Sequence, residues 1–166
     1  LMVSRRLASK GEYAESEKLA LAVIADIRKS VPLRERDLAA ALGALGALYM
    51  KSGRNAERVE VYRESLPLVQ RALGDEHWQA GIVRHNLASA LEAIGQDQEA
   101  LEHSERAVGI GIATVGAEHN FTTAARLMRE RLHCKLSGGA GADPTEHAEL
   151  AILIEKFPDY RERLAE

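Results

Sequence analysis

The chain has 166 residues, enough for one domain that buries roughly 70% of its unfolded surface. Hydrophobic residues make up 46% of the sequence but aromatic residues only 4%, a composition that favours helices over strands. A net charge of −3 argues against a nucleic-acid partner, and the longest apolar stretch, residues 38–50, is too short to span a membrane.

A repeat of 42 residues organises the chain. The glycines Gly11, Gly53 and Gly95 stand 42 residues apart and are followed by similar residues. A second marker, at residues 73–77 and 115–119, has the same interval and ends in His77 and His119. Two independent markers in one register show that the repeat is real.

Amphipathic helices are predicted on both sides of these glycines. A glycine suits the turn between two helices because it adopts positive φ without steric cost. Small residues at Gly46 and Ala88 are expected to let neighbouring helices approach closely. Apolar residues recur at helical spacing in six segments, residues 19–27, 38–49, 62–73, 83–94, 101–112 and 128–136.

These features resemble the tetratricopeptide repeat. The matching residues are Leu45, Gly46, Tyr49 and Gly53 in one unit and Leu87, Ala88, Leu91 and Gly95 in the next. The 42-residue spacing and the connector that ends in histidine resemble the longer variety found in kinesin light chains and many bacterial signalling proteins. The resemblance implies an all-α fold, a right-handed α-solenoid of antiparallel helix pairs with three to four repeats.

One departure from the family pattern concerns Arg58. The equivalent residues in the neighbouring units are Ser16 and Ala100, where the family prefers a small side chain. We therefore expect looser packing in the second unit.

The sequence predicts a single domain in three parts. The repeat array covers residues 1–137, a Gly-rich connection covers residues 138–143, and residues 144–166 form a C-terminal pair of capping helices. Asp143 and Pro144 are typical of a helix start. Val3 and Leu7 fall in the register of a first helix, so we expect the chain to be a segment of a longer protein.

No catalytic or metal-binding constellation is visible in the sequence. The six histidines lack the spacing that places two imidazoles on one helix face for zinc, and Cys134 has no base and orienting group around it. A single cysteine and the lack of a signal-peptide pattern favour a cytoplasmic location. We therefore expect no enzyme activity, no cofactor and no metal, and we expect His77 and His119 to bond free backbone groups of the connectors.

The resemblance implies a concave groove lined by the first helix of each unit, which binds a protein or peptide. The Asn86 amide could pair with a partner's backbone, although a bond to a neighbouring helix is an equal alternative. Lys51 and Arg131 alone do not make a clamp for a terminal carboxylate. The register places nine residues in the groove: Gly43, Ala47, Met50, Lys51, His85, Asn86, Ser89, Glu92 and Arg131.

The predicted function is a protein–protein interaction module within a larger regulatory or signalling protein. The alternative is self-association as a homo-oligomer, through Met50, the face at residues 43–46, or an open N-terminal edge that exposes apolar surface. An enzyme is the third class, and the sequence offers no site for it.

Overall fold

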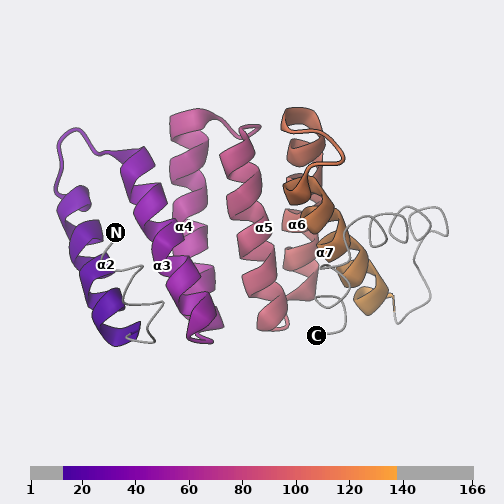
Figure 1. Cartoon of the computed structure of the whole chain (residues 1–166), viewed down its shortest axis with the longest axis horizontal. Coiled ribbons are helices and arrows are strands. Elements are labelled where there is room, and N and C mark those ends of the chain that lie inside the picture. Colours follow the sequence, from indigo (N-terminus) through magenta and orange to yellow (C-terminus); the bar gives the residue numbers. More distant parts are fainter. Residues whose placement is uncertain (1–12, 138–166) are drawn as a thin grey trace.

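The computed structural model describes residues 13–137, which form six helices arranged side by side in chain order (Figure 1). Each helix packs against the next one in the chain, and α5 also contacts α7. No strand occurs within these residues, so the predicted all-α helical repeat solenoid is confirmed. The helices are α2 (Tyr13–Arg28), α3 (Glu35–Lys51), α4 (Asn55–Leu73), α5 (Trp78–Ala93), α6 (Asp97–Thr114) and α7 (Asn120–Leu136).

Four predictions concern residues outside this range. Gly11 and the first helix expected around Val3 and Leu7 precede the described residues. The Gly-rich connection at 138–143 and the capping helices at 144–166 follow them. None of the described helices is long and apolar enough to cross a membrane.

The core runs continuously from helix to helix. Leu45 of α3 and Leu87 and Leu91 of α5 are at most 2% exposed, and Tyr49 is 6% exposed. They belong to one apolar cluster that extends from α2 to α7. Each unit therefore completes its core only with its neighbours, as expected for a stacked repeat.

A small residue sets the distance between α3 and α4. A Cβ atom added at Gly46 would lie 2.5 Å from the Cζ atom of Tyr62. Ala88, the equivalent residue in α5, is completely buried. At Gly46 the space for a larger side chain is taken up by Tyr62 of α4.

The turns after α3 and α5 have the same geometry. Gly53 and Gly95 adopt φ of +71° and +77°, in the left-handed region. The backbone amide of Arg54 donates to the carbonyl of Tyr49 at 2.9 Å, and Gln96 donates to Leu91 at the same distance. These bonds satisfy carbonyl groups at the helix ends, which the helix itself leaves unpaired.

Gly53→Ala is expected to lower the free energy of unfolding by about 1–2 kcal/mol, because a Cβ atom is strained in left-handed backbone. Gly109→Ala is the control: Gly109 lies inside α6 without positive φ, and an added Cβ would meet nothing within 4 Å. It should instead stabilise by about 0.5–1 kcal/mol through helix propensity. Urea unfolding measures both, and equal shifts would contradict the role of Gly53 in the turn.

The connector histidines cap the helices that follow them. The Nδ1 atoms of His77 and His119 accept hydrogen bonds from the backbone amides of Gln79 and Phe121, each at 3.2 Å. Each bond satisfies one of the amides that the first turn of a helix leaves free. The capping histidine thus fixes where α5 and α7 begin.

Candidate functional site

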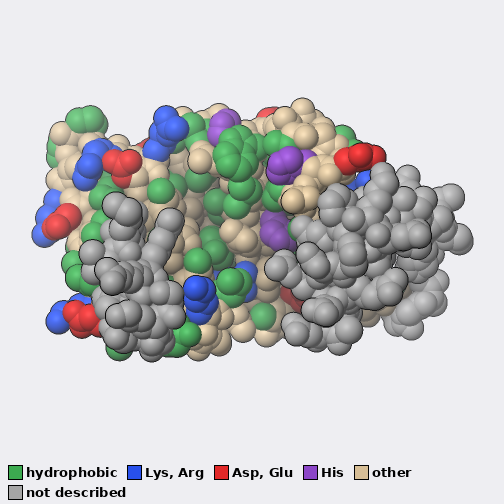
Figure 2. All heavy atoms as spheres, viewed as in Figure 1, with side chains coloured by type: hydrophobic (Ala, Val, Ile, Leu, Met, Phe, Trp, Pro, Cys, Tyr) green, Lys and Arg blue, Asp and Glu red, His purple; other side chains and the backbone are tan. Residues whose placement is uncertain are grey.

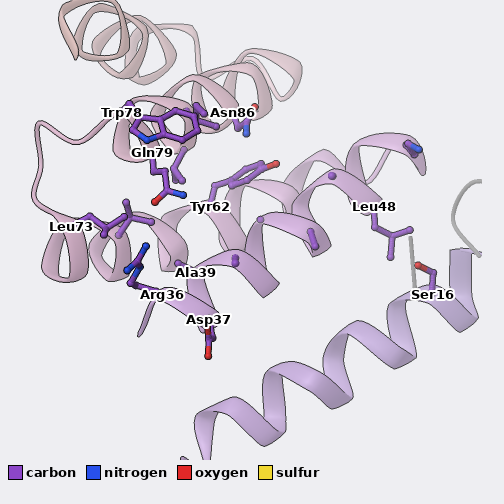
Figure 3. A pocket seen from close by; sticks show the side chains of 18 residues that line it. Ser16, Arg36, Asp37, Ala39, Leu48, Tyr62, Leu73, Trp78, Gln79 and Asn86 are labelled. Carbon is purple, nitrogen blue, oxygen red and sulfur yellow. The ribbon is translucent and has the colours of Figure 1, made fainter. Parts of the chain in front are cut away.

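A cavity of about 880 Å³ lies between α3 and α5, with α4 behind it (Figure 3). Its volume is in the range typical of ligand-binding sites. Tyr62 and Leu73 of α4 and Trp78 and Asn86 of α5 lie around the same space. The lining residues are Ser16, Arg36, Asp37, Ala39, Ala40, Gly43, Ala44, Ala47, Leu48, Lys51, Tyr62, Val69, Leu73, Trp78, Gln79, Ile82, Val83 and Asn86.

Small side chains on α3 create the cavity. Ala40, Gly43, Ala44 and Ala47 recur at helical spacing and all belong to the lining. A Cβ atom added at Gly43 would meet nothing within 4 Å. Because these side chains are small, α3 leaves the space open, and any larger side chain there would enter the cavity.

The walls formed by α4 and α5 are largely apolar. Val69 and Leu73 come from α4, and Trp78 and Ile82 come from α5. Trp78 stays 43% exposed at the start of α5. Hydrophobic and histidine side chains gather in the middle of the face shown in Figure 2. An exposed aromatic group beside an apolar wall is typical of protein-binding surfaces.

The connector before Trp78 is anchored by Asp75. This carboxylate accepts hydrogen bonds from Gln70 and Arg84 at 2.7 Å and from Arg106 at 3.0 Å. These bonds, above all the one from Arg84, hold the pKa of Asp75 well below its usual range. The start of α5 is thereby tied to α4 and α6.

Positive charge predominates around the cavity. Arg36 and Lys51 line it and make no ion pair with other residues of the described segment. Asp37 is the only carboxylate of the described lining, and it lies 3.3 Å from Arg34. This differs from the chain as a whole, which has a net charge of −3.

Arg58 lies against two residues of the lining. It is 4% exposed, its Nη2 atom donates to the backbone carbonyl of Asn86 at 3.3 Å, and its guanidinium lies 5.8 Å from the Tyr62 ring centroid. The sequence predicted looser packing at this position. The structure instead places the whole side chain in the interior, between α4 and α5.

The side-chain amide of Asn86 makes no hydrogen bond with the described residues, so the alternative of a bond to a neighbouring helix is not observed. Asn86 is half-buried and belongs to the lining. Its amide is thus available to a group that enters the cavity.

His85, the residue before Asn86, faces a different neighbour. Its ring packs edge-on against Phe121 of α7, with ring centroids 6.0 Å apart. Its Nδ1 atom is buried without a hydrogen-bond partner. Burial and, to a smaller extent, the positive charges of Arg58 and Arg131 together lower the pKa of His85 to about 4. The imidazole is therefore neutral at pH 7.

The structure divides the predicted groove residues into two groups. Four of them line the cavity: Gly43, Ala47, Lys51 and Asn86. The other five lie outside it: Met50, His85, Ser89, Glu92 and Arg131.

The residues outside the cavity have different surroundings. The Glu92 carboxylate accepts two hydrogen bonds from Arg131, at 2.7 and 2.5 Å, which link α5 to α7. Met50 is 52% exposed, and Ser89 is half-buried. The Glu92–Arg131 pair connects two units, so neither side chain is as available as the Asn86 amide.

Sequence reasoning missed the end of the cavity nearest the start of α5. Trp78, Gln79 and Arg36 line the cavity but were not among the predicted groove residues. A signal was present, because Ala40 lies about one turn and Arg36 about two turns before Gly43 on the same helix face. Trp78 and Ile82 hold the equivalent places in the next unit.

No group of three or more His, Cys, Asp or Glu residues within 13–137 is arranged to hold a metal ion. Cys134 is a free, partly buried thiol in α7. The features that the described structure does offer are the cavity and the charges beside it.

Comparison with known protein families gives one match. The sequence profile described as "Tetratricopeptide repeat" matches residues 37–111, which run from the start of α3 to near the end of α6. The cavity lies largely within this segment. No curated protein matches the chain in sequence.

Several solved structures have the same fold. One is a Podosopora anserina protein of kinesin light chain type with nearly identical TPR-like repeats. It is 23% identical over 99% of this chain and 89% of that chain, with a TM-score of 0.72. BtubC (BKLC) from P. vanneervenii is 14% identical over 98% and 73%, with a TM-score of 0.69. The apo form of RapI is 12% identical over 98% and 58%, with a TM-score of 0.79.

Proposed function

Because residues 37–111 belong to the tetratricopeptide repeat family, whose members typically bind proteins or peptides, we propose that the cavity between α3 and α5 binds a segment of another protein. The family is typically a non-enzymatic scaffold. The module would then serve a larger regulatory or signalling protein by holding its partner.

The observation that carries this proposal is the open space at Gly43. The cavity of about 880 Å³ exists because α3 presents small residues to the apolar wall of α5. Apolar lining with a few available polar groups is what a binding site for a peptide requires. The Asn86 amide supplies such a group, with one donor and one acceptor function.

The direct test fills the cavity from α3. Peptides selected by display on the wild-type chain are titrated against the wild type and Gly43→Phe. Trp78 is the only tryptophan, so its fluorescence reports an occupant of the lining. We expect Gly43→Phe to weaken binding at least about tenfold, or 1.4 kcal/mol, since the phenyl ring occupies the space.

Gly109→Phe is the matched control. Gly109 is also a helix glycine with nothing within 4 Å of an added Cβ, but it lies in α6 and outside the lining. It should bind the peptides as the wild type does. If Gly43→Phe keeps full affinity, or if both variants lose it equally, the cavity is not the binding site.

Self-association is the second candidate, and the 52% exposed Met50 favours it to a limited degree. Light scattering across a concentration series measures the molar mass and so distinguishes self-association from a monomer that binds peptides. A dimer that Met50→Glu dissociates, together with the absence of any selected peptide, would replace the proposed function with self-association.

A further inference from the structure

The boundary between α5 and α7 is held by a ring contact. Phe121 of α7 packs edge-on against His85 of α5, with ring centroids 6.0 Å apart. Two glycines make room for the phenyl ring, because a Cβ atom added at Gly81 or at Gly111 would lie 3.1 Å from one of its carbon atoms. The ring therefore fills a space beside α5 and α6 that is shaped to receive it.

An ion pair holds the same boundary further along the two helices. Arg131 of α7 donates two hydrogen bonds to the carboxylate of Glu92 in α5, at 2.7 and 2.5 Å. Such a pair fixes the orientation of the two groups as well as their distance. Because α7 also packs against α6, the helices α5, α6 and α7 are joined to one another on every side.

Neither contact is repeated one unit earlier, between α3 and α5. Each of the four side chains has a counterpart 42 residues before it that cannot make the same contact. No hydrogen bond or ion pair among residues 13–137 joins α3 directly to α5, and the cavity lies between them. The counterparts are Gln79 for Phe121, Gly43 for His85, Met50 for Glu92 and Ser89 for Arg131.

The units on either side of the cavity are joined mainly by the packing of α4 against α5. Val69 of α4 and Leu87 of α5 belong to the same buried cluster. An ion pair between Arg63 of α4 and Glu99 of α6 adds to this contact, but its side chains are 41% and 38% exposed. Exposed ion pairs contribute little to stability. The α4–α5 contact is therefore the one firm attachment, and it leaves rotation about its own line free.

No side chain of α3 defines one angle at this boundary. Packed helices keep a fixed crossing angle because side chains of one fit between those of the other. Ala40, Gly43 and Ala44 face the cavity from α3, and the cavity separates them from Trp78 and Ile82 of α5. A rotation there breaks no interlocking contact, and it changes only the width of the cavity and the exposure of its apolar wall.

We propose that the space between α3 and α5 is a hinge. The pair of α3 and α4 rotates about the α4–α5 contact, because the ring contact and the ion pair of the next boundary are missing here, whereas α5, α6 and α7 move as one body. The rotation sets the width of the cavity. The hinge itself does not depend on the proposed function, and only its consequence for the size of a bound segment does.

Distances between spin labels test the hinge without any peptide. Lys51, Ala93 and Lys135 are exposed residues 42 positions apart, in the last turns of α3, α5 and α7. They are changed to cysteine in pairs and labelled in a Cys134→Ser background, and pulsed electron paramagnetic resonance gives the distance distributions. We expect a wider distribution for 51–93 than for 93–135. Equal widths, or a wider 93–135 distribution, would overturn the hinge.

Transferring the ion pair tests its cause. Met50→Glu combined with Ser89→Arg places between α3 and α5 the pair that Glu92 and Arg131 form between α5 and α7. The 51–93 distribution should then narrow toward the width of 93–135. Met50→Glu alone is the matched control, since it adds the charge without a partner, and it should leave the width unchanged. An equal effect of the single and the double variant would contradict the missing contacts as the cause.

The reverse changes should loosen the other boundary. Phe121→Gln removes the ring contact and Glu92→Met removes the ion pair, each with the residue found one unit earlier. Both should widen the 93–135 distribution and leave 51–93 as it is. Circular dichroism verifies the helix content, and Glu92→Met, which leaves the apolar core intact, decides the question if Phe121→Gln unfolds. An unchanged 93–135 width in the folded variants would show that these contacts do not hold α5 and α7 together.

The hinge and the proposed function can fail separately. A wider 51–93 distribution together with peptides that ignore Gly43→Phe would overturn the binding function and leave the hinge. Peptide binding that Gly43→Phe abolishes, together with equal widths at the two boundaries, would overturn only the hinge.

Discussion

Leu87→Ala is expected to lower the free energy of unfolding by about 2–5 kcal/mol, as large-to-small changes in packed cores do. Leu87 is 1% exposed in α5, and Ala88 and Leu91 beside it are completely buried. Because α5 packs against α4, α6 and α7, a void there weakens contacts within a unit and between units. Urea unfolding followed by circular dichroism measures the change.

The neighbouring residue provides the control. Asn86→Ala should change the free energy of unfolding by about 0.5 kcal/mol or less, since its amide makes no hydrogen bond within the described structure. It should nevertheless weaken the binding of a groove segment. If Asn86→Ala unfolds the domain as Leu87→Ala does, Asn86 is a structural residue and its place in the binding site is wrong.

Acid is expected to destabilise the fold through His85. The pKa of His85 is lowered to about 4 in the native state, against an ordinary value of 6.5 in the unfolded chain. Above pH 6.5 both states are neutral and the group has no effect. As the pH falls from 6.5 to 4, only the unfolded state binds the proton, so stability is lost. The full loss below pH 4 is about 3 kcal/mol at most.

His85→Leu isolates this contribution. Leucine already occupies the equivalent position of the next unit, Leu127, where it is 5% exposed. The free energy of unfolding of His85→Leu should depend less on pH between 6.5 and 4 than that of the wild type. Subtracting one curve from the other cancels the contribution of the carboxylates, which both proteins share. Parallel curves would show that His85 is accessible to protons in the native state.

Much of the architecture could be predicted from local sequence. Gly53 and Gly95 marked the turns because few other residues adopt positive φ at low cost, and both have φ above +70°. The spacing of Leu45, Leu87 and Leu91 marked the faces that pack together. These features depend on residues within one or two helical turns, so they are visible in a single sequence.

The site was predictable only in part. The register placed Gly43, Ala47, Lys51 and Asn86 on the groove side of their helices, where the cavity lies. It also placed Glu92 and Arg131 there, but these two side chains pair with each other across α5 and α7. Helical periodicity gives the direction of a side chain and not the identity of its partner 39 residues away.

The sequence by itself determined the repeat, the helices, their turns and their apolar faces, because each follows from spacing and from the conformational preferences of single residues. Only the tertiary structure decided which side chains stay available. It opened the cavity where the small face of α3 meets α5, paired Arg131 with Glu92, and buried Arg58 without a carboxylate from the described residues. These outcomes depend on distances between residues far apart in the chain, and such distances exist only once the helices have packed.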